Sequence, residues 1–261
     1  MSFSIDQFRL DGKVAVITGA GGRGNSIGRA YALGLAKAGA SVVVADLKAD
    51  GAQSVRDEIV AAGGKAQAVE VDITQPDSVK RMAETAHQTF GGVDILVNNA
   101  ALMAELGYLP AVDIPLEQWN RILDVNLTGA LNCVQAIVPL MRQRGGGKIV
   151  NQVSGGAYPA QSVYGISKLA LVGLTTTLAR QLGREKINVN AIAPGNTMSE
   201  AGKSLTPDES PFVKLLEATV AMRVRGQPDE LVGSLLLLCS SAGDWITGQV
   251  LHVDGGWVLR P

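Results

Sequence analysis

The chain has 261 residues, and its 23 Lys and Arg side chains nearly balance 24 Asp and Glu side chains, so the formal net charge is −1 at pH 7. This balance argues against the large basic surface by which proteins bind nucleic acids. Apolar residues make up 46% of the chain, which is enough to form the core of a globular protein. Because α/β folds of this length commonly form one unit, we expect a single domain over residues 1–261.

Neither the N-terminal segment nor the cysteines indicate export, a membrane or a metal. Residues 1–12 lack the basic region and the apolar run of a signal peptide. We expect no later segment to be a continuous apolar run of about 18 residues, the length of a membrane-spanning helix. Cys133 and Cys239 lie in apolar, helix-like stretches without metal-ligand spacing, which is typical of buried thiols. We expect a cytoplasmic protein with no membrane or nucleic-acid partner and no bound metal.

Short runs rich in β-branched residues alternate with longer amphipathic segments along the chain. The predicted strands are 14–18, 41–45, 66–71, 93–97, 148–153, 187–193 and 249–253. The predicted helices are 27–38, 52–61, 77–89, 116–142, 163–182 and 229–239. This alternation predicts a doubly wound α/β fold with a mostly parallel, seven-stranded sheet. The least regular stretch, at about 195–226, is polar and has Gly or Pro near both ends, which favours a mobile substrate lid.

A glycine-rich turn, TGAGGRGNSIG over residues 18–28, joins the first predicted strand to the first predicted helix. Glycines allow close approach of a pyrophosphate to the backbone, and the N-terminus of the following helix offers free N–H groups. Such a turn can also be a plain connection. Its position between the first strand and the first helix nevertheless favours a dinucleotide site and therefore a Rossmann fold.

Asp46 follows the second predicted strand, where a carboxylate can accept hydrogen bonds from the adenosine ribose and repel a 2′-phosphate. Its alternative role is that of a helix N-cap, although Asp50 is better placed for that role. Arg23 in the glycine-rich turn can pair with a 2′-phosphate and so weaken the discrimination. We expect NAD as the cofactor, with its strictness over NADP left open by Arg23.

Further motifs follow in order along the rest of the chain. They are Asn98-Asn99-Ala100-Ala101, Asn126 within residues 124–129, Ser154, the run Tyr164-Gly165-Ile166-Ser167-Lys168, Pro194-Gly195 and the closing segment 246–256. With the glycine-rich turn, they make nearly the whole chain resemble the short-chain dehydrogenase/reductase family. The resemblance implies a Rossmann-fold dehydrogenase that forms a homotetramer through the helices predicted at 116–142 and 163–182.

The chain departs from the family pattern at two places. The glycine-rich turn is about three residues longer than the family's TGxxxGxG form. Ser154 and Tyr164 are closer in sequence than the family's serine and tyrosine commonly are, so Ser162 is the alternative hydroxyl. We retain Ser154 because it follows a predicted strand, where sites of α/β proteins collect.

Tyr164 is the predicted acid and base of the reaction. Reduction of a ketone needs a proton donor at the oxygen, and oxidation of an alcohol needs the same group as a base. Lys168, four residues later, shares a helix face with Tyr164. A positive charge about 4 Å away contributes on the order of 4 kcal/mol at an effective dielectric constant of about 20, so we expect Lys168 to lower the pKa of Tyr164. Taken alone, this spacing is more often a lysine lying over an aromatic ring.

The family resemblance implies the remaining roles. Ser154 holds the substrate oxygen, Lys168 also binds the nicotinamide ribose, and Asn126 positions a water that passes protons to Lys168. Asn98 braces the sheet. The residues implied in cofactor binding are Gly19, Arg23, Ser26, Ile27, Gly28, Asp46, Asp72, Ile73, Asn99, Ala100, Tyr164, Lys168, Pro194, Gly195 and Thr197.

We expect an NAD(H)-dependent enzyme that interconverts a secondary alcohol, such as a cyclic alcohol, a diol or a polyol, and its ketone. The candidate pocket residues are mostly apolar and are Met103, Leu106, Tyr108, Tyr158, Met198 and Phe212. Two alternatives remain. One is an NADPH-dependent 3-oxoacyl thioester reductase, which Asp46 argues against; the other is a nucleotide-sensing regulator that kept the fold without the chemistry. His252 and the Asp254-Gly255-Gly256 segment are interpreted as structural.

Overall fold

The computed structural model describes residues 4–22, 24–103, 110–158, 160, 162–205, 209 and 211–259. Its centre is a seven-stranded sheet in the order β3-β2-β1-β4-β5-β6-β7, in which every neighbouring pair is parallel. The strands are β1 (Val14–Thr18), β2 (Ser41–Asp46), β3 (Lys65–Glu70), β4 (Ile95–Asn98), β5 (Gly147–Gln152), β6 (Ile187–Pro194) and β7 (Val250–Val253). The predicted doubly wound parallel sheet is therefore confirmed, with strand ends that differ by a few residues.

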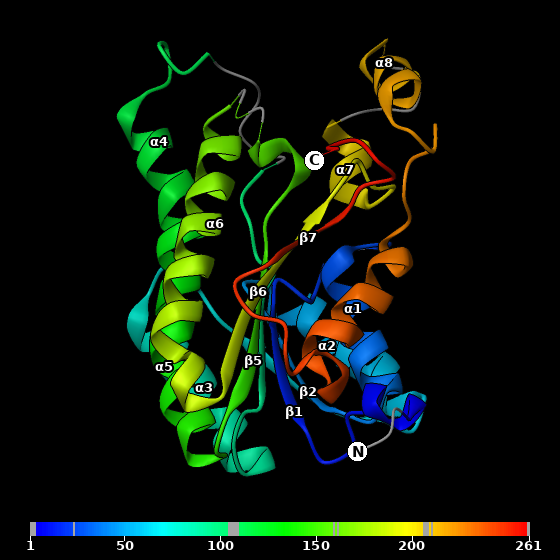
Figure 1. The fold of residues 1–261 in the computed structure, drawn as a ribbon. Coiled ribbons are helices and arrows are strands. Elements are labelled where there is room, and N and C mark those ends of the chain that lie inside the picture. The colour runs from blue at the N-terminus through cyan, green and yellow to red at the C-terminus, as the bar shows by residue number, and fades with distance from the viewer. Residues whose placement is uncertain are drawn as a thin grey trace.

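Helices cover both faces of this sheet (Figure 1). One face carries α1 (Ile27–Lys37), α2 (Ala49–Ala61) and α9 (Val232–Cys239). The other carries α3 (Pro76–Phe90), α5 (Gly129–Gln143) and α6 (Val163–Leu182).

The first strand shows why a continuous apolar run forms a central strand here. All five residues of β1 are buried. Ala15 and Ile17 pack in the core below α1, and Val16 packs in the core on the other face. Alternate side chains of a strand point to opposite faces, so both faces of a sheet covered by helices must be apolar. Burial of each large aliphatic side chain contributes roughly 1.5–3 kcal/mol.

The single helix predicted at 116–142 is divided into α4 (Leu116–Leu123), one π-helical turn (Asp124–Thr128) and α5. π-Helical turns are rare, but those that occur inside α-helices often lie at functional sites. This one contains Asn126. The combined helix, Leu116–Gln143, has the length and mean hydropathy of a candidate membrane span. Cys133 and Ile137 pack against the sheet as in a core helix, so these properties are explained by the fold.

The stretch predicted to be irregular at about 195–226 contains two short helices, α7 (Glu200–Leu205) and α8 (Pro211–Thr219). They lie beside the carboxyl ends of the strands, close to the C-terminal segment (Figure 1). These helices were not predicted, because the Gly and Pro residues near the ends of the stretch indicated an irregular segment.

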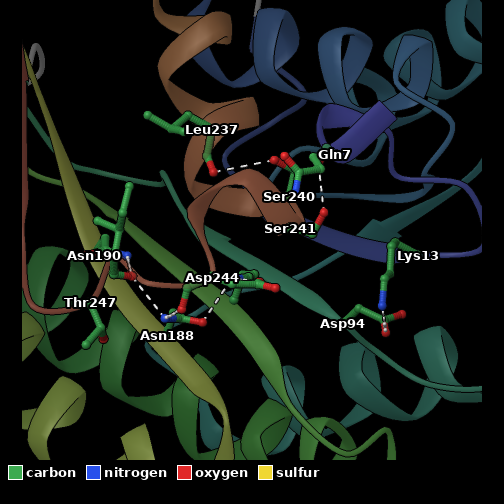
Figure 2. A network of polar contacts seen from close by, with 12 residues as sticks. Gln7, Lys13, Asp94, Asn188, Asn190, Leu237, Ser240, Ser241, Asp244 and Thr247 are labelled. Carbon is green, nitrogen blue, oxygen red and sulfur yellow. Dashed lines mark hydrogen bonds and ion pairs between the residues drawn. The ribbon is translucent and has the colours of Figure 1, made fainter. Parts of the chain in front are cut away.

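A polar network closes the opposite edge of the sheet, at the amino ends of the strands (Figure 2). The Asp94 carboxylate accepts hydrogen bonds from the Val14 N–H at 3.0 Å and from the Arg144 guanidinium at 3.0 Å. Lys13 lies 3.5 Å from the same carboxylate, and Asn188 donates to the Asp244 carbonyl at 3.0 Å. The contacts of Asp94 join the start of β1 to the start of β4 and to the residues before β5, and the bond of Asn188 joins β6 to the residues after α9. Ligands of parallel α/β sheets bind at the other edge, outside the carboxyl ends of the strands.

Candidate active site

A cleft of about 930 Å³ opens at the carboxyl ends of the strands, where the strand order reverses between β1 and β4. Parallel α/β sheets bind ligands at this switch point. The cleft brings together most of the predicted site residues. They are Gly19, Ser26, Ile27, Gly28, Asp46, Asp72, Ile73, Asn99, Ala100, Ser154, Tyr164, Pro194, Gly195 and Thr197. Arg23 lies outside the described residues.

The glycine-rich turn forms a cradle that larger residues would fill. Gly19 has φ +64°, and a Cβ on it would lie 2.7 Å from the Cα of Ala100. A Cβ on Gly28 would lie 2.2 Å from the Gly19 carbonyl oxygen. The Ser26 hydroxyl caps α1 by accepting a hydrogen bond from the Arg29 N–H at 3.2 Å. A bare backbone beside a helix N-terminus fits a pyrophosphate, so these residues suit a dinucleotide.

Asn99 fixes the shape of this cradle from the neighbouring strand. Its side-chain amide donates to the carbonyl oxygens of Thr18 at 2.9 Å and Gly19 at 3.0 Å. Asn98, one residue earlier, donates to the Asn151 side chain on β5 at 2.9 Å, as expected of a residue that braces the sheet. The paired asparagines therefore hold β1, β4 and β5 in register around the cleft.

The Asp46 carboxylate lines the cleft and is held on both oxygens. Oδ2 accepts from the Gly21 N–H at 2.9 Å, and Oδ1 accepts from the Lys48 N–H at 3.0 Å. The prediction that Asp50 caps the next helix is wrong, because α2 begins at Ala49 with Lys48 as its N-cap residue. Each carboxylate oxygen keeps a further lone pair, so Asp46 can still accept hydrogen bonds from a ribose.

The extra residues of the glycine-rich turn contact the segment that leads into α7. The side-chain amide of Asn25 donates to the Met198 carbonyl at 3.4 Å, and the Glu200 N–H donates to the Asn25 carbonyl at 3.2 Å. A Cβ on Gly24 would lie 3.0 Å from the Cγ of Glu200. The longer turn therefore reaches across the cleft mouth, which the family pattern did not predict.

The two candidate hydroxyls occupy different places. Ser162 is the N-cap of α6, and its Oγ accepts from the Gly165 N–H at 3.2 Å. Ser154 follows β5 and lines the same cleft as Tyr164, whose pKa it lowers. Its Oγ also accepts from the Gly156 N–H at 3.1 Å. The geometry therefore favours Ser154 over Ser162 as the hydroxyl that faces a substrate.

Burial dominates the pKa values of Tyr164 and Lys168. It raises the pKa of Tyr164 to about 12, although the hydrogen bond with Ser154 opposes this rise. It lowers the pKa of Lys168 to about 7. The expectation that Lys168 lowers the pKa of Tyr164 is wrong, because the burial of Tyr164 itself dominates and raises its pKa. Its Nζ donates to the Gln152 carbonyl at 2.8 Å and lies 5.6 Å from the centre of the Tyr164 ring.

Asn126 lies behind the cleft and joins two of its walls. Its Oδ1 accepts from the Leu102 N–H at 2.7 Å, and its Nδ2 donates to the Leu102 carbonyl at 3.1 Å. The same Nδ2 donates to the Ser167 hydroxyl at 3.0 Å, which in turn donates to the Tyr164 carbonyl at 2.7 Å. Asn126 therefore connects the segment after β4 to the helix that carries Tyr164 and Lys168.

Comparisons with known proteins agree with this geometry. A family model described as enoyl-(acyl carrier protein) reductase matches residues 22–258. An uncharacterized oxidoreductase of Mycobacterium tuberculosis is 46% identical over 251 residues, which are 96% of this chain and 99% of the relative. The 7alpha-hydroxysteroid dehydrogenase of Escherichia coli is 40% identical over 260 residues, 98% of each chain. The chain belongs to the short-chain dehydrogenase/reductase family.

Two further similarities describe the range of relatives within this family. A solved structure of 7 alpha-hydroxysteroid dehydrogenase complexed with NADH and 7-oxo glycochenodeoxycholic acid superimposes with a TM-score of 0.90 at 39% identity, covering 99% of both chains. A 3-oxoacyl-[acyl-carrier-protein] reductase of Thermotoga maritima is 34% identical over 254 residues, 96% of this chain and all (100%) of the relative. The protein is thus an oxidoreductase of the short-chain dehydrogenase/reductase family with its nucleotide-binding fold.

The structure also shows which pocket residues the sequence interpretation found and which it missed. Of the predicted wall residues, Met103 lines the cleft, whereas Leu106, Tyr108 and the Phe212 side chain lie outside the described part of the chain. The Tyr158 ring lies against His252 with ring centres 4.9 Å apart. Trp257 also lines the cleft and was not predicted. No pattern in the last residues of the sequence indicates that they pack beside the cleft.

Proposed function

We propose that this short-chain dehydrogenase/reductase uses NAD(H) to interconvert a secondary alcohol and its ketone. The observation that carries the proposal is that Ser154 and Tyr164 line the same cleft as the glycine-rich turn, with the buried Lys168 amine held by the Gln152 carbonyl behind them. A module that only binds nucleotides has no need for paired hydroxyls and a buried amine at this point.

NAD fits the adenosine end of the cleft. In our proposal Asp46 accepts hydrogen bonds from the ribose hydroxyls, and its negative charge disfavours a 2′-phosphate. The backbone around Gly19, Ser26 and Gly28 would hold the pyrophosphate. When bound, NAD supplies the acceptor of the hydride in alcohol oxidation and, in its reduced form, the donor of the hydride in ketone reduction.

The proton moves through Tyr164 in both directions of the proposed reaction. In reduction, the Tyr164 hydroxyl donates its proton to the carbonyl oxygen that Ser154 holds, and Lys168 returns a proton to the phenolate. In oxidation, neutral Lys168 accepts the phenol proton first, and the phenolate then takes the proton of the alcohol. With a pKa of about 7, Lys168 is present in both its neutral and its charged form near neutral pH. Asn126 is proposed to hold a water that connects Lys168 to solvent.

A second candidate, supported by the Thermotoga relative, is reduction of a 3-oxoacyl thioester. That reaction would use the same Ser154, Tyr164 and Lys168. It is the less favoured candidate because it would ordinarily use NADPH, which Asp46 disfavours.

We further propose that the short helices α7 and α8 belong to a substrate lid at about 195–226 of a single domain, and that the enzyme is a cytoplasmic homotetramer. Leu116 on α4 is 77% exposed and Leu169 on α6 is 44% exposed, as expected where helices pack against another copy. Sedimentation velocity at micromolar concentration should give a tetramer, and a monomer boundary would contradict the assembly.

The proposed reaction is tested by following reduction of NAD and NADP with cyclic and linear secondary alcohols, diols and polyols. We expect NAD-linked turnover that Tyr164→Phe abolishes without weakening NADH binding. Turnover preserved in Tyr164→Phe would refute the role of Tyr164. Preference for NADPH with 3-oxoacyl thioesters would replace the first candidate by the second, and NADH binding without any turnover would favour a nucleotide-sensing role.

A further inference from the structure

The turn that follows β7 is built around one carboxylate. Asp254 Oδ1 accepts from the N–H groups of Gly256 at 2.9 Å and Trp257 at 3.2 Å. Its Oδ2 accepts from the Val258 N–H at 2.9 Å and lies 3.4 Å from His252 Nδ1. Three backbone donors on one side chain fix the path of the chain from residue 254 to residue 258. The sequence interpretation of Asp254-Gly255-Gly256 as a structural turn fits this arrangement, which also sets the direction of Trp257.

This turn is held between the end of β6 and the segment that leaves α8. The Gly195 N–H donates to the Val253 carbonyl at 3.1 Å, and a Cβ on Gly195 would lie 2.7 Å from the Cα of Asp254. On the other side, the Met222 N–H donates to the Gly255 carbonyl at 2.9 Å. The turn therefore connects the rigid carboxyl edge of the sheet to the proposed lid.

The Trp257 indole lies on the backbone that follows the candidate serine. A Cβ on Gly155 would lie 2.8 Å from its Cε3 and 3.0 Å from its Cζ3, and a Cβ on Gly156 would lie 3.9 Å from its Cη2. Trp257 lines the same cleft as Ser154 and Tyr164 and is only partly buried. Part of the indole is therefore open to the cleft, beside the backbone that follows Ser154.

We propose that Trp257 is a specificity-determining residue that selects secondary alcohols whose carbinol carbon belongs to an apolar ring. The inference rests on the proposed function, since it concerns the substrate of the same cleft. A rigid ring buries apolar surface against the indole and loses little conformational freedom on binding. A polyol would place hydroxyl groups against indole carbons, where they lose water without gaining a partner. Met103 and Leu102, both at the cleft, extend the apolar wall.

The discriminating experiment compares Trp257→Ala and Trp257→Phe with the wild type on cyclohexanol, 2-decalol, 2-butanol and sorbitol. Trp245→Ala is the matched control, because Trp245 is fully exposed and lies at the opposite edge of the sheet. We expect Trp257→Ala to lower the ratio of kcat/KM for 2-decalol to that for 2-butanol by about tenfold or more, mainly through KM. Trp257→Phe should keep most of the ratio, and Trp245→Ala should keep all of it. An unchanged ratio in Trp257→Ala, or a wild type that prefers sorbitol, would overturn the proposal.

A binding measurement separates this inference from the proposed function. Calorimetric titration of 2-decalol into the NAD complex of Tyr164→Phe reports recognition without turnover. Binding that disappears in the Tyr164→Phe, Trp257→Ala double variant supports the role of Trp257 even if no alcohol is oxidised. Equal binding in both variants, or no binding of 2-decalol to either, contradicts it even if the enzyme oxidises another alcohol. An unaltered Kd for NADH shows that each variant has kept its fold.

Discussion

The carboxylate of Asp46 accepts a hydrogen bond of 2.9 Å from the backbone N–H of Gly21, across the mouth of the nucleotide cleft. The same carboxylate accepts from the Lys48 N–H at 3.0 Å. A Cβ on Gly21 would lie 2.4 Å from the backbone nitrogen of Ala52, so the turn packs directly on the first residues of α2. Asp46 therefore shapes the glycine-rich turn in addition to its proposed role in binding the ribose.

Replacement of Asp46 by Ala should relax the preference for NAD. We expect kcat/KM with NAD to fall by about ten- to a hundredfold, because a hydrogen bond to a charged group contributes about 1.5–3 kcal/mol. The value of kcat/KM with NADP should change less, because the variant also removes the repulsion between Asp46 and the 2′-phosphate. Thermal unfolding should also begin earlier, since two backbone donors lose their acceptor. Asp50→Ala, which removes an equal charge from an exposed position nearby, is the control. If both variants shift the NAD to NADP ratio equally, long-range charge rather than contact sets the preference.

Lys168→Met should stabilise the protein while abolishing turnover. Burial lowers the pKa of Lys168 to about 7 from its ordinary 10.5, so folding disfavours its ammonium form. Between these pH values the unfolded chain binds the extra proton, and the stability of the wild type therefore rises with pH. The stabilising effect of the Met variant should be largest at or below pH 7, despite loss of the hydrogen bond to the Gln152 carbonyl. It should shrink as the pH rises toward 9.

Urea unfolding of both proteins at several pH values from 6 to about 9 measures this difference. Burial raises the pKa of Cys133 and of Cys239 from 9.0 to about 12 and that of Tyr164 from 10.0 to about 12, so these groups also make stability depend on pH near the upper limit. Both proteins carry them, so their contributions cancel in the difference between the two unfolding free energies. A difference in unfolding free energy that does not vary with pH would mean that folding does not lower the pKa of Lys168. Loss of stability in the Met variant at pH 7 would mean the same.

The sequence predicted the sheet because its signal is local. The run Val14–Thr18, rich in β-branched residues, indicates a buried strand, and the glycine-rich turn directly after it marks where this strand ends. The features that were missed depend on distant parts of the chain. The π-helical turn at Asn126 satisfies the Leu102 backbone and Ser167, and the position of Trp257 depends on Asp254 and on glycines a hundred residues earlier in the sequence. The expected direction of the Tyr164 pKa shift was wrong for the same reason, because the burial of Tyr164 cannot be read from its four-residue spacing to Lys168.

The contact between the glycine-rich turn and the proposed lid gives a third prediction. The Asn25 amide donates to the Met198 carbonyl at 3.4 Å and lies 3.5 Å from the Gln227 Oε1. Asn25→Ala removes both contacts but keeps the bond from the Glu200 N–H to the Asn25 carbonyl, which is backbone. We expect limited proteolysis within about 195–226 to become several-fold faster, with a modest rise in KM for NAD. Gln53→Ala, at an exposed position on α2, should leave the cleavage rate as in the wild type. Equal cleavage in wild type and Asn25→Ala would show that Asn25 does not hold the lid.

Gly155→Ala tests how tightly the indole is seated. The added methyl would lie 2.8 Å and 3.0 Å from two indole carbons of Trp257 and 3.3 Å from the Pro194 carbonyl oxygen, so the indole must move. Overpacking of this kind costs typically about 1–3 kcal/mol of stability. We expect a loss in that range together with a raised KM for the alcohol, whereas the KM for NAD should stay constant.

Gly233→Ala is the matched glycine control for this prediction. A Cβ on Gly233, within α9, meets nothing within 4 Å. The substitution should stabilise the protein by about 0.5–1 kcal/mol, as expected for Gly to Ala inside a helix. Because the two variants add the same methyl group, a lower unfolding free energy of Gly155→Ala than of Gly233→Ala reflects the crowding at Gly155, where Trp257 is the nearest neighbour. If Gly155→Ala proves as stable as Gly233→Ala and binds the alcohol unchanged, the indole does not rest on Gly155 in solution, and Trp257 does not form the wall beside Ser154.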